Sequence, residues 1–333
     1  MLWWRPSLSP ALMPAYMLAH MPEVRFACAA LAHFRRYCRC GLAAGLALVA
    51  LASPALAAGA TEPQPSSDAG TNDAGALAKL VQQAQDGLAD AQFHLGRLYA
   101  QGREVARDPA EAVRWYRKAA NQGHAEAQAY LALAYAGGRG VEKNAAIARV
   151  WFERAATQGD AIAQSMLGVI YSQGQGVAKD PVQAVRWYQL AAAQGDAAAQ
   201  ADLGMMLLNG EGVDKSPAQA AIWLHRAADQ GNVIAQLNLG YLYEHGIGVP
   251  QSYAEEAGWL RKAAARGAAD AQFALGILYC NGRGVARDLV EGYRWLLLSA
   301  GQGHESARQA VEAFRKQLTA EQRARSESAA GAH

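Results

Sequence analysis

The apolar and polar positions of this chain recur with a period of 36 residues over most of its length. In the first half of each unit, apolar residues such as Ala91, Leu95 and Tyr99 follow the i, i+4, i+8 spacing of one helix face. In the second half, Ala112 precedes Trp115 by three residues, which is again a helical spacing. Each unit is therefore predicted to be a pair of helices joined by a turn.

Tryptophan marks the same place in every copy of the repeat. An Ala-Gln pair and a glycine recur in the same phase, and three markers that keep their phase over six copies indicate a true internal repeat. We predict that the tryptophans pack in the core, where loss of one would destabilise the protein by roughly 3–5 kcal/mol. These residues are Trp115, Trp151, Trp187, Trp223, Trp259 and Trp295.

Turn signals separate the predicted helices. The first helix of a unit ends at a loop with two glycines, such as Gly174 and Gly176, because glycine adopts backbone angles that other residues avoid. The second helix begins at Asp180-Pro181, where the Asp can cap free amides, and it ends at Gly195. Stacked units of this kind predict an all-α fold, a right-handed α-solenoid of six 36-residue helix-turn-helix repeats.

The solenoid is predicted to span residues 74–320 with a capping helix at each end. Residues 74–86 form a lone second-type helix before the first copy, and residues 304–318 form a lone first-type helix after the last. Beyond Thr319, which can cap a short helix, residues 321–333 are predicted to be a charged tail.

Residues 1–57 have the pattern of a cleaved secretory signal. A basic segment precedes the uncharged, apolar residues 41–52, and small residues lead to Ala57, after which cleavage is predicted. The alternative is an uncleaved membrane anchor, although the apolar stretch is shorter than the roughly 20 residues that a span needs. Residues 1–20 lack a coherent pattern, so we predict either that translation starts at Met21 or that residues 1–20 are a gene-model extension.

The signal pattern predicts a periplasmic or secreted protein with no stable membrane span after cleavage. Residues 58–73 are polar, contain proline and are predicted to be a linker. Beyond the signal, acidic residues outnumber basic residues by two, and no basic stripe indicates nucleic-acid binding. Cys280 is the one cysteine there and is predicted to be a packed thiol, with a reactive thiol as the alternative.

Motifs for catalysis or metal binding are missing from the sequence beyond the signal. It contains no H-E-x-x-H, no S-x-x-K and no G-x-S-x-G, and the repeated G-x-G loops lack the lysine of a phosphate-binding loop. His124 and His304 stand where other copies have a helix-capping Asp or Asn. We therefore predict that the protein is not an enzyme and has no catalytic residues, cofactor or metal.

The pattern A-x-A-Q-x-x-L-G-x-x-Y, G-x-G-V and D-P-x-x-A-x-x-W-Y-x-x-A-A-x-x-G resembles the SEL-one-like repeat (SLR) family of tetratricopeptide-like superhelices. The resemblance covers residues 74 to about 318. It implies an adaptor or scaffold role in assembling protein complexes, often in bacterial envelopes, and a concave surface lined by the first helices. A fold alone does not define a function, so the partner stays open.

The resemblance places two rows of residues on the concave surface. The inner row is Arg97, Leu133, Val169, Met205, Tyr241 and Ile277. The neighbouring row is Phe93, Ala129, Ser165, Ala201, Leu237 and Phe273. Tyr241 and Phe273 are the candidate aromatic anchors for a partner. The alternative is that these side chains only pack between successive helices.

Together these features predict an exported scaffold that binds protein partners on its concave surface. A protein that binds envelope carbohydrate, either peptidoglycan or exopolysaccharide, is the first alternative, and a hydrolase is the second. The carbohydrate alternative requires exposed aromatic and acidic residues on that surface.

Overall fold

The computed structural model describes residues 69–331 of the chain. Within them it contains 15 helices and no strand. The predicted signal peptide of residues 1–57, the cleavage after Ala57 and the proposed extension of residues 1–20 lie outside the described residues. The predicted linker of residues 58–73 is too long, because helix α2 already begins at Ala69.

Twelve helices of 13 residues each form six consecutive pairs, one pair per repeat. The first helices are α3 (Ala89–Gln101), α5 (Ala125–Gly137), α7 (Ala161–Gln173), α9 (Ala197–Asn209), α11 (Val233–His245) and α13 (Ala269–Asn281). The second helices are α4 (Pro109–Asn121), α6 (Ala145–Thr157), α8 (Pro181–Ala193), α10 (Pro217–Asp229), α12 (Tyr253–Ala265) and α14 (Leu289–Gly301).

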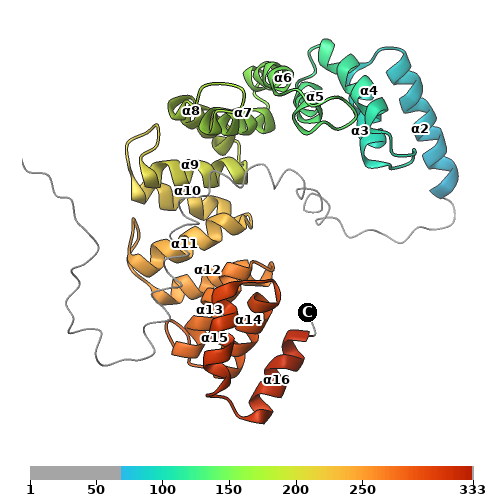
Figure 1. The fold of residues 1–333 in the computed structure, drawn as a ribbon. Helices are drawn as coiled ribbons and strands as arrows, with labels where there is room; N and C mark the ends of the chain where they lie inside the picture. Colours follow the sequence, from blue (N-terminus) through green and yellow to red (C-terminus); the bar gives the residue numbers. More distant parts are fainter. Residues whose placement is uncertain (1–68, 332–333) are drawn as a thin grey trace, which may run out of the picture.

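The pairs follow one another along a curved path (Figure 1). Helix α2 (Ala69–Gln85) lies at one end, and α15 (Glu305–Arg315) and α16 (Ala320–Gly331) lie at the other. Each second helix packs against the first helix of its own repeat and against the first helix of the next. The prediction of an all-α solenoid is therefore confirmed.

Local chemistry sets the ends of these helices as predicted. The Asp180 side chain accepts a hydrogen bond from the amide of Gln183, and Pro181 occupies the first position of α8. Helix α7 ends at Gly174, which has a left-handed φ of 72° and donates its N–H to the carbonyl of Ile170. These bonds satisfy backbone groups that a helix end leaves without partners.

Histidine takes the capping role at the start of two first helices. Nδ1 of His124 accepts a hydrogen bond of 3.2 Å from the amide of Ala127. Nδ1 of His304 accepts one of 3.1 Å from the amide of Ala307. The capping position predicted for both residues is confirmed.

Glycine in the first helix lets the second helix of the same repeat approach closely. A Cβ atom on Gly96 would lie only 2.7 Å from the ring of Tyr116, so any larger residue would displace that ring. Other copies pair a small residue with a bulky one in the same way. The bulky, almost fully buried residues are Tyr116, Phe152, Tyr188, Leu224, Leu260 and Leu296.

Each of these bulky residues directly follows a tryptophan, and the tryptophans are less buried than predicted. Trp115, Trp259 and Trp295 are 6–9% exposed, whereas the other three are only half-buried. They lie between repeats, as Trp115 does against Leu80 and Ala84 of α2. The core prediction is therefore confirmed for Trp115, Trp259 and Trp295, whereas Trp151, Trp187 and Trp223 pack against the core while staying partly exposed.

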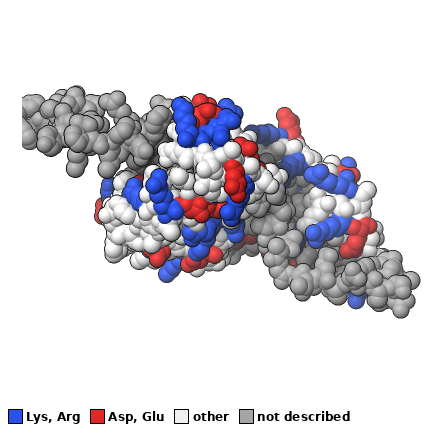
Figure 2. Space-filling view, turned by 90° about the horizontal axis from the view of Figure 1, so that it is seen from below, with Lys and Arg blue, Asp and Glu red and all other residues white. Residues whose placement is uncertain are grey.

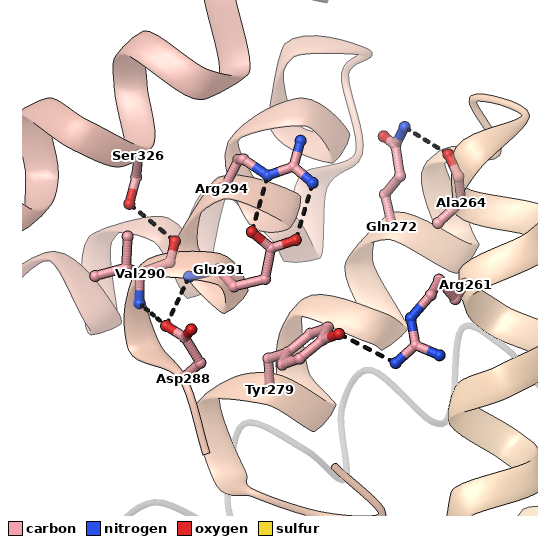
Figure 3. A network of polar contacts seen from close by, with 9 residues as sticks. All are labelled: Arg261, Ala264, Gln272, Tyr279, Asp288, Val290, Glu291, Arg294 and Ser326. Carbon is pink, nitrogen blue, oxygen red and sulfur yellow. Dashed lines mark hydrogen bonds and ion pairs between the residues drawn. The ribbon is translucent and has the colours of Figure 1, made fainter. Parts of the chain in front are cut away.

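A cationic side chain covers the ring face of most tryptophans. Lys118 lies 3.9 Å from the ring centroid of Trp115, and Arg154 lies 4.7 Å from that of Trp151. Cation–π contact of this kind stabilises by about 0.5–1 kcal/mol at exposed sites. Other arginines of the second helices bond to the first helices instead: Arg117 donates to the Tyr135 hydroxyl at 2.9 Å, and Arg261 donates to that of Tyr279 at 3.1 Å (Figure 3).

Buried glutamines join the repeats through a ladder of hydrogen bonds. Nε2 of Gln128 donates to the carbonyl of Ala120 at 3.1 Å, and its Oε1 accepts from Nε2 of Gln158 at 2.8 Å. The equivalent glutamines are 2–5% exposed in all six repeats. The ladder is incomplete at repeat five, where Arg266 replaces the donating glutamine and Oε1 of Gln236 is buried without a partner.

Replacement of Arg266 by glutamine is expected to raise the free energy of unfolding by about 1 kcal/mol, because the new amide can satisfy Oε1 of Gln236. Urea denaturation followed by circular dichroism measures the change. As a matched control, Gln158→Arg removes the donor of repeat two and is expected to lower stability by a similar amount. Equal stabilities for all three proteins would contradict the ladder.

The C-terminal end is closed by a helix where a charged tail was predicted at residues 321–333. Thr319 and Gln322 form a reciprocal capping box at the start of α16, with hydrogen bonds of 3.0 and 3.2 Å. Ser326, fully buried, donates to the carbonyl of Val290 in α14 at 2.9 Å (Figure 3). Helix α16 therefore packs on α14 as part of the folded end of the solenoid.

Candidate interaction surface

The first helices lie on the inner side of the arc. In the upper part of Figure 1, α3, α5 and α7 lie inside α4, α6 and α8. Contacts between side chains join consecutive first helices directly: Nε2 of His124 lies 3.2 Å from Asp90, and the Ser165 hydroxyl lies 3.3 Å from Asp196. The inner surface is therefore built from neighbouring first helices, as the resemblance implied.

The first helices expose the same four positions, which we call the inner stripe, except that Asn238 at the second position of α11 is buried. In α7 these positions are Ile162, Met166, Val169 and Gln173, at i, i+4, i+7 and i+11, while the residues between them are mostly buried. The predicted inner row coincides with the third of these positions. Its members Arg97, Leu133, Val169, Met205, Tyr241 and Ile277 are all half-buried.

The neighbouring row that the sequence placed on the surface is mainly buried. Phe93 is 2% exposed, with its ring centroid 4.8 Å from that of His124 and 5.3 Å from that of Tyr130. It cannot contact a partner, so its assignment to the binding surface is corrected. Ala129, Ser165 and Ala201 are buried as well, and only Leu237 and Phe273 are half-buried.

The surface residues that sequence reasoning missed stand one position further along the chain. Tyr130, Met166 and Asp202 are half-buried members of the inner stripe. Their spacing of three residues before the inner row was a usable signal, because residues at i and i+3 share one helix face. Which of the adjacent residues Ala201 and Asp202 is exposed on the inner surface depends on the orientation of the next first helix.

Both candidate aromatic anchors contact a histidine. The ring centroid of Tyr241 lies 4.3 Å from that of His245, which is exposed at the edge of α11. Phe273 stacks on His304 with centroids 4.7 Å apart, and Nε2 of that histidine lies 3.2 Å from Asp270. Phe273 therefore packs between two first helices, whereas Tyr241 belongs to the inner stripe itself.

Asp202 is a carboxylate among apolar residues of the stripe. It receives a hydrogen bond from the phenol of Tyr188, which reaches it from α8. Burial raises the pKa of Asp202 to about 7, the bond from Tyr188 lowers it, and the nearby charge of Asp196 raises it. The same effect occurs one repeat earlier, where burial and then Glu126 raise the pKa of Asp160.

Two further ionisable groups are buried away from the stripe. Glu256 is 5% exposed and occupies a position that is alanine in repeats one to four, and burial raises its pKa to about 8. Cys280 is 1% exposed, and burial raises the pKa of its thiol to about 12. Its sulfur fills the space beside Gly292, so the prediction of a packed thiol is confirmed.

The described residues contain neither a cluster of metal ligands nor a membrane-spanning helix. Between residues 69 and 331, no three His, Cys, Asp or Glu side chains gather closely enough to hold a metal ion. No helix in that range combines the length and the apolar character needed to cross a membrane. The face shown in Figure 2 carries charges of both signs interspersed with uncharged surface.

These features define a class of protein, an all-α repeat scaffold with a continuous inner face of helices. The Sel1 repeat model matches six consecutive segments of the chain. They are residues 89–124, 125–160, 161–196, 197–232, 233–267 and 269–304. The chain belongs to the Sel1 repeat family, which confirms the SLR resemblance.

Solved structures with the same fold include two from bacteria. The c5321 protein, a protective antigen of uropathogenic Escherichia coli strains with an SLR fold, is 36% identical with a TM-score of 0.70. The match covers 75% of this chain but only 54% of that antigen, so this chain spans about half of its length. A Sel1 repeat protein from Oxalobacter formigenes is 35% identical with a TM-score of 0.60, covering 65% of this chain and 89% of that one.

A search of curated proteins found no match. Proteins built from Sel1 repeats generally mediate protein–protein interactions and are generally not enzymes. For this chain, the family therefore supports protein partners as a class.

Proposed function

We propose that this protein is an exported scaffold that binds a polypeptide partner along its inner stripe. The observation that carries the proposal is the alignment of half-exposed apolar side chains on five consecutive first helices. Aligned apolar residues that face water are typical of surfaces that bind another macromolecule. These residues include Leu133, Met166, Val169, Met205, Tyr241 and Ile277.

The shape of the surface favours a long, narrow partner. The stripe runs across the repeats, so an extended or helical segment of a partner can lie along it and contact several first helices. The periplasmic or secreted location rests on the signal pattern of residues 1–57. No described residue set favours envelope carbohydrate over polypeptide, so that alternative enters as an outcome of the test.

The test replaces two apolar residues of the stripe by a neutral polar residue. Cells that produce the full chain are fractionated, the envelope is crosslinked, and crosslinked polypeptides are identified by mass spectrometry. For the Val169→Gln/Met205→Gln variant, the amount of crosslinked partner is expected to fall at least about tenfold relative to wild type, because desolvated apolar contacts dominate such interfaces.

The matched control makes the same chemical change on the outer side of the arc. Ile222 of α10 is 53% exposed, and Ile222→Gln is expected to leave crosslinking unchanged. Thermal melting shows whether both variants fold. Equal capture by all three proteins would refute the inner stripe as the binding surface, and recovery of the chain only in the cytoplasmic fraction would refute export. Crosslinks to peptidoglycan that depend on the stripe would favour the carbohydrate alternative.

A further inference from the structure

Positive charge is segregated from the inner surface of repeats two to six, whereas repeat one carries Arg97 on its first helix α3. Five of the six first helices contain no lysine or arginine, namely α5, α7, α9, α11 and α13. Every second helix from α4 to α14 contains at least one arginine. The first helices do carry acidic residues. Those on the inner stripe of α5 to α13 are Glu126, Asp202 and Asp270.

Acidic caps extend this negative surface along the middle repeats. Asp160 and Asp196 cap α7 and α9 through hydrogen bonds of 2.8 and 2.7 Å to backbone amides. Glu126 acts on Asp160, and Asp196 acts on Asp202, in each case by raising the pKa of the neighbouring acid. The surface between α5 and α9 therefore combines apolar side chains with mutually repelling carboxylates.

We propose that the bound segment is a basic amphipathic polypeptide, with apolar side chains on Val169 and Met205 and a lysine or arginine paired with Asp202. This inference rests on the proposed function and names the class of its partner. A carboxylate held among apolar side chains is poorly hydrated, so a cation from the partner stabilises its charged form. The same acids repel an acidic segment, which provides selectivity between partners.

The position of Asp202 suits this role. The residue stands on α9, in the fourth of six repeats, and is one helical turn from Met205 on the same face. The hydrogen bond from Tyr188 holds its carboxylate in place, and that tyrosine is itself 1% exposed. A cation that meets Asp202 is therefore flanked by the apolar residues of α7 and α9.

The experiment measures binding of two fluorescein-labelled peptides to the full chain by fluorescence polarisation. The basic peptide is 16 residues of leucine, serine and lysine in a helical amphipathic pattern, and its acidic twin has glutamate at every lysine. We expect the basic peptide to bind at least about tenfold more tightly than its twin, because paired charges discriminate strongly when they are desolvated. Asp202→Asn is expected to reduce that preference at least about fivefold, as expected for loss of one such pair.

Asp229 provides a matched control, because it is an exposed acid at the end of the second helix α10. Asp229→Asn removes the same charge from the outer side and is expected to leave the preference unchanged. The wild-type preference is expected to weaken as the pH falls through about 7, where Asp202 becomes protonated, and Asp202→Asn is expected to lack this step.

Three outcomes would overturn the inference: no binding of the basic peptide, equal binding of both peptides, or equal effects of Asp202→Asn and Asp229→Asn. The proposed function is judged separately by the crosslinking of the Val169→Gln/Met205→Gln variant. If crosslinking depends on the stripe while the peptides show no charge preference, the surface binds a partner of another composition. If the peptides discriminate but crosslinking is unaffected, the proposed function fails.

Discussion

Replacement of Phe152 by alanine is expected to lower the free energy of unfolding by about 4 kcal/mol, because a fully buried aromatic side chain leaves a large cavity. The ring is 0% exposed and lies among Ala132, Leu167 and Ile170. Alanine at position 132 already takes the place of the glycine that other copies have, so the neighbouring helix has little room to move into the cavity. Urea denaturation at 25 °C measures the loss.

The comparison with Trp151 makes this prediction specific. Trp151 is half-buried, and Arg154 covers its ring at 4.7 Å. Trp151→Ala is expected to destabilise by about 2 kcal/mol, since much of the ring already contacts water or a charged side chain. A larger loss for Trp151→Ala than for Phe152→Ala would contradict the ranking of the two residues by their burial.

The second large effect is expected at a glycine turn. Gly212 has a left-handed φ of 69°, and a Cβ atom there would overlap the carbonyl group of Pro181 at the start of α8. Gly212→Ala is expected to destabilise by about 3 kcal/mol, of which about 1 comes from the backbone conformation and the rest from displacement of α8. Urea denaturation again provides the measurement.

Gly176 separates the two contributions. Its φ is 71°, but the nearest atom to an added Cβ is that of Ala145, 3.8 Å away. Gly176→Ala therefore tests the backbone conformation alone and is expected to cost about 1 kcal/mol. Equal losses at both glycines would mean that the close approach of loop and helix contributes nothing.

Phe152 and Gly212 both act where neighbouring elements of the solenoid meet. Phe152 of α6 packs against α5 of its own repeat and against α7 of the next, and the lack of a side chain at Gly212 lets one repeat contact the preceding one. In a solenoid the total stability is close to a sum of such local terms, because each repeat contacts only its neighbours. A loss at one repeat is therefore expected to open that part of the arc first.

The binding surface was only partly predictable. The inner row through Val169, Met205 and Tyr241 is half-exposed, but Phe93 of the neighbouring row is buried and Asp202 was missed. Adjacent residues on a helix point about 100° apart, so an error of one position exchanges a packing residue for a surface residue. The exposed position follows from the orientation of the next first helix, which no single repeat specifies.

The sequence by itself determined the number of repeats, the helix pairs and their ends, because spacing, caps and glycine turns act over a few residues. Asp180, Pro181 and Gly174 show this directly, since each forms its helix end with atoms that lie within four residues. Only the tertiary structure decided which of Trp151 and Phe152 is more buried, that α16 packs on α14, and that Asp202 lies on the inner stripe. Those outcomes depend on the angle at which one repeat stacks on the next, and this angle results from the packing of many side chains at once.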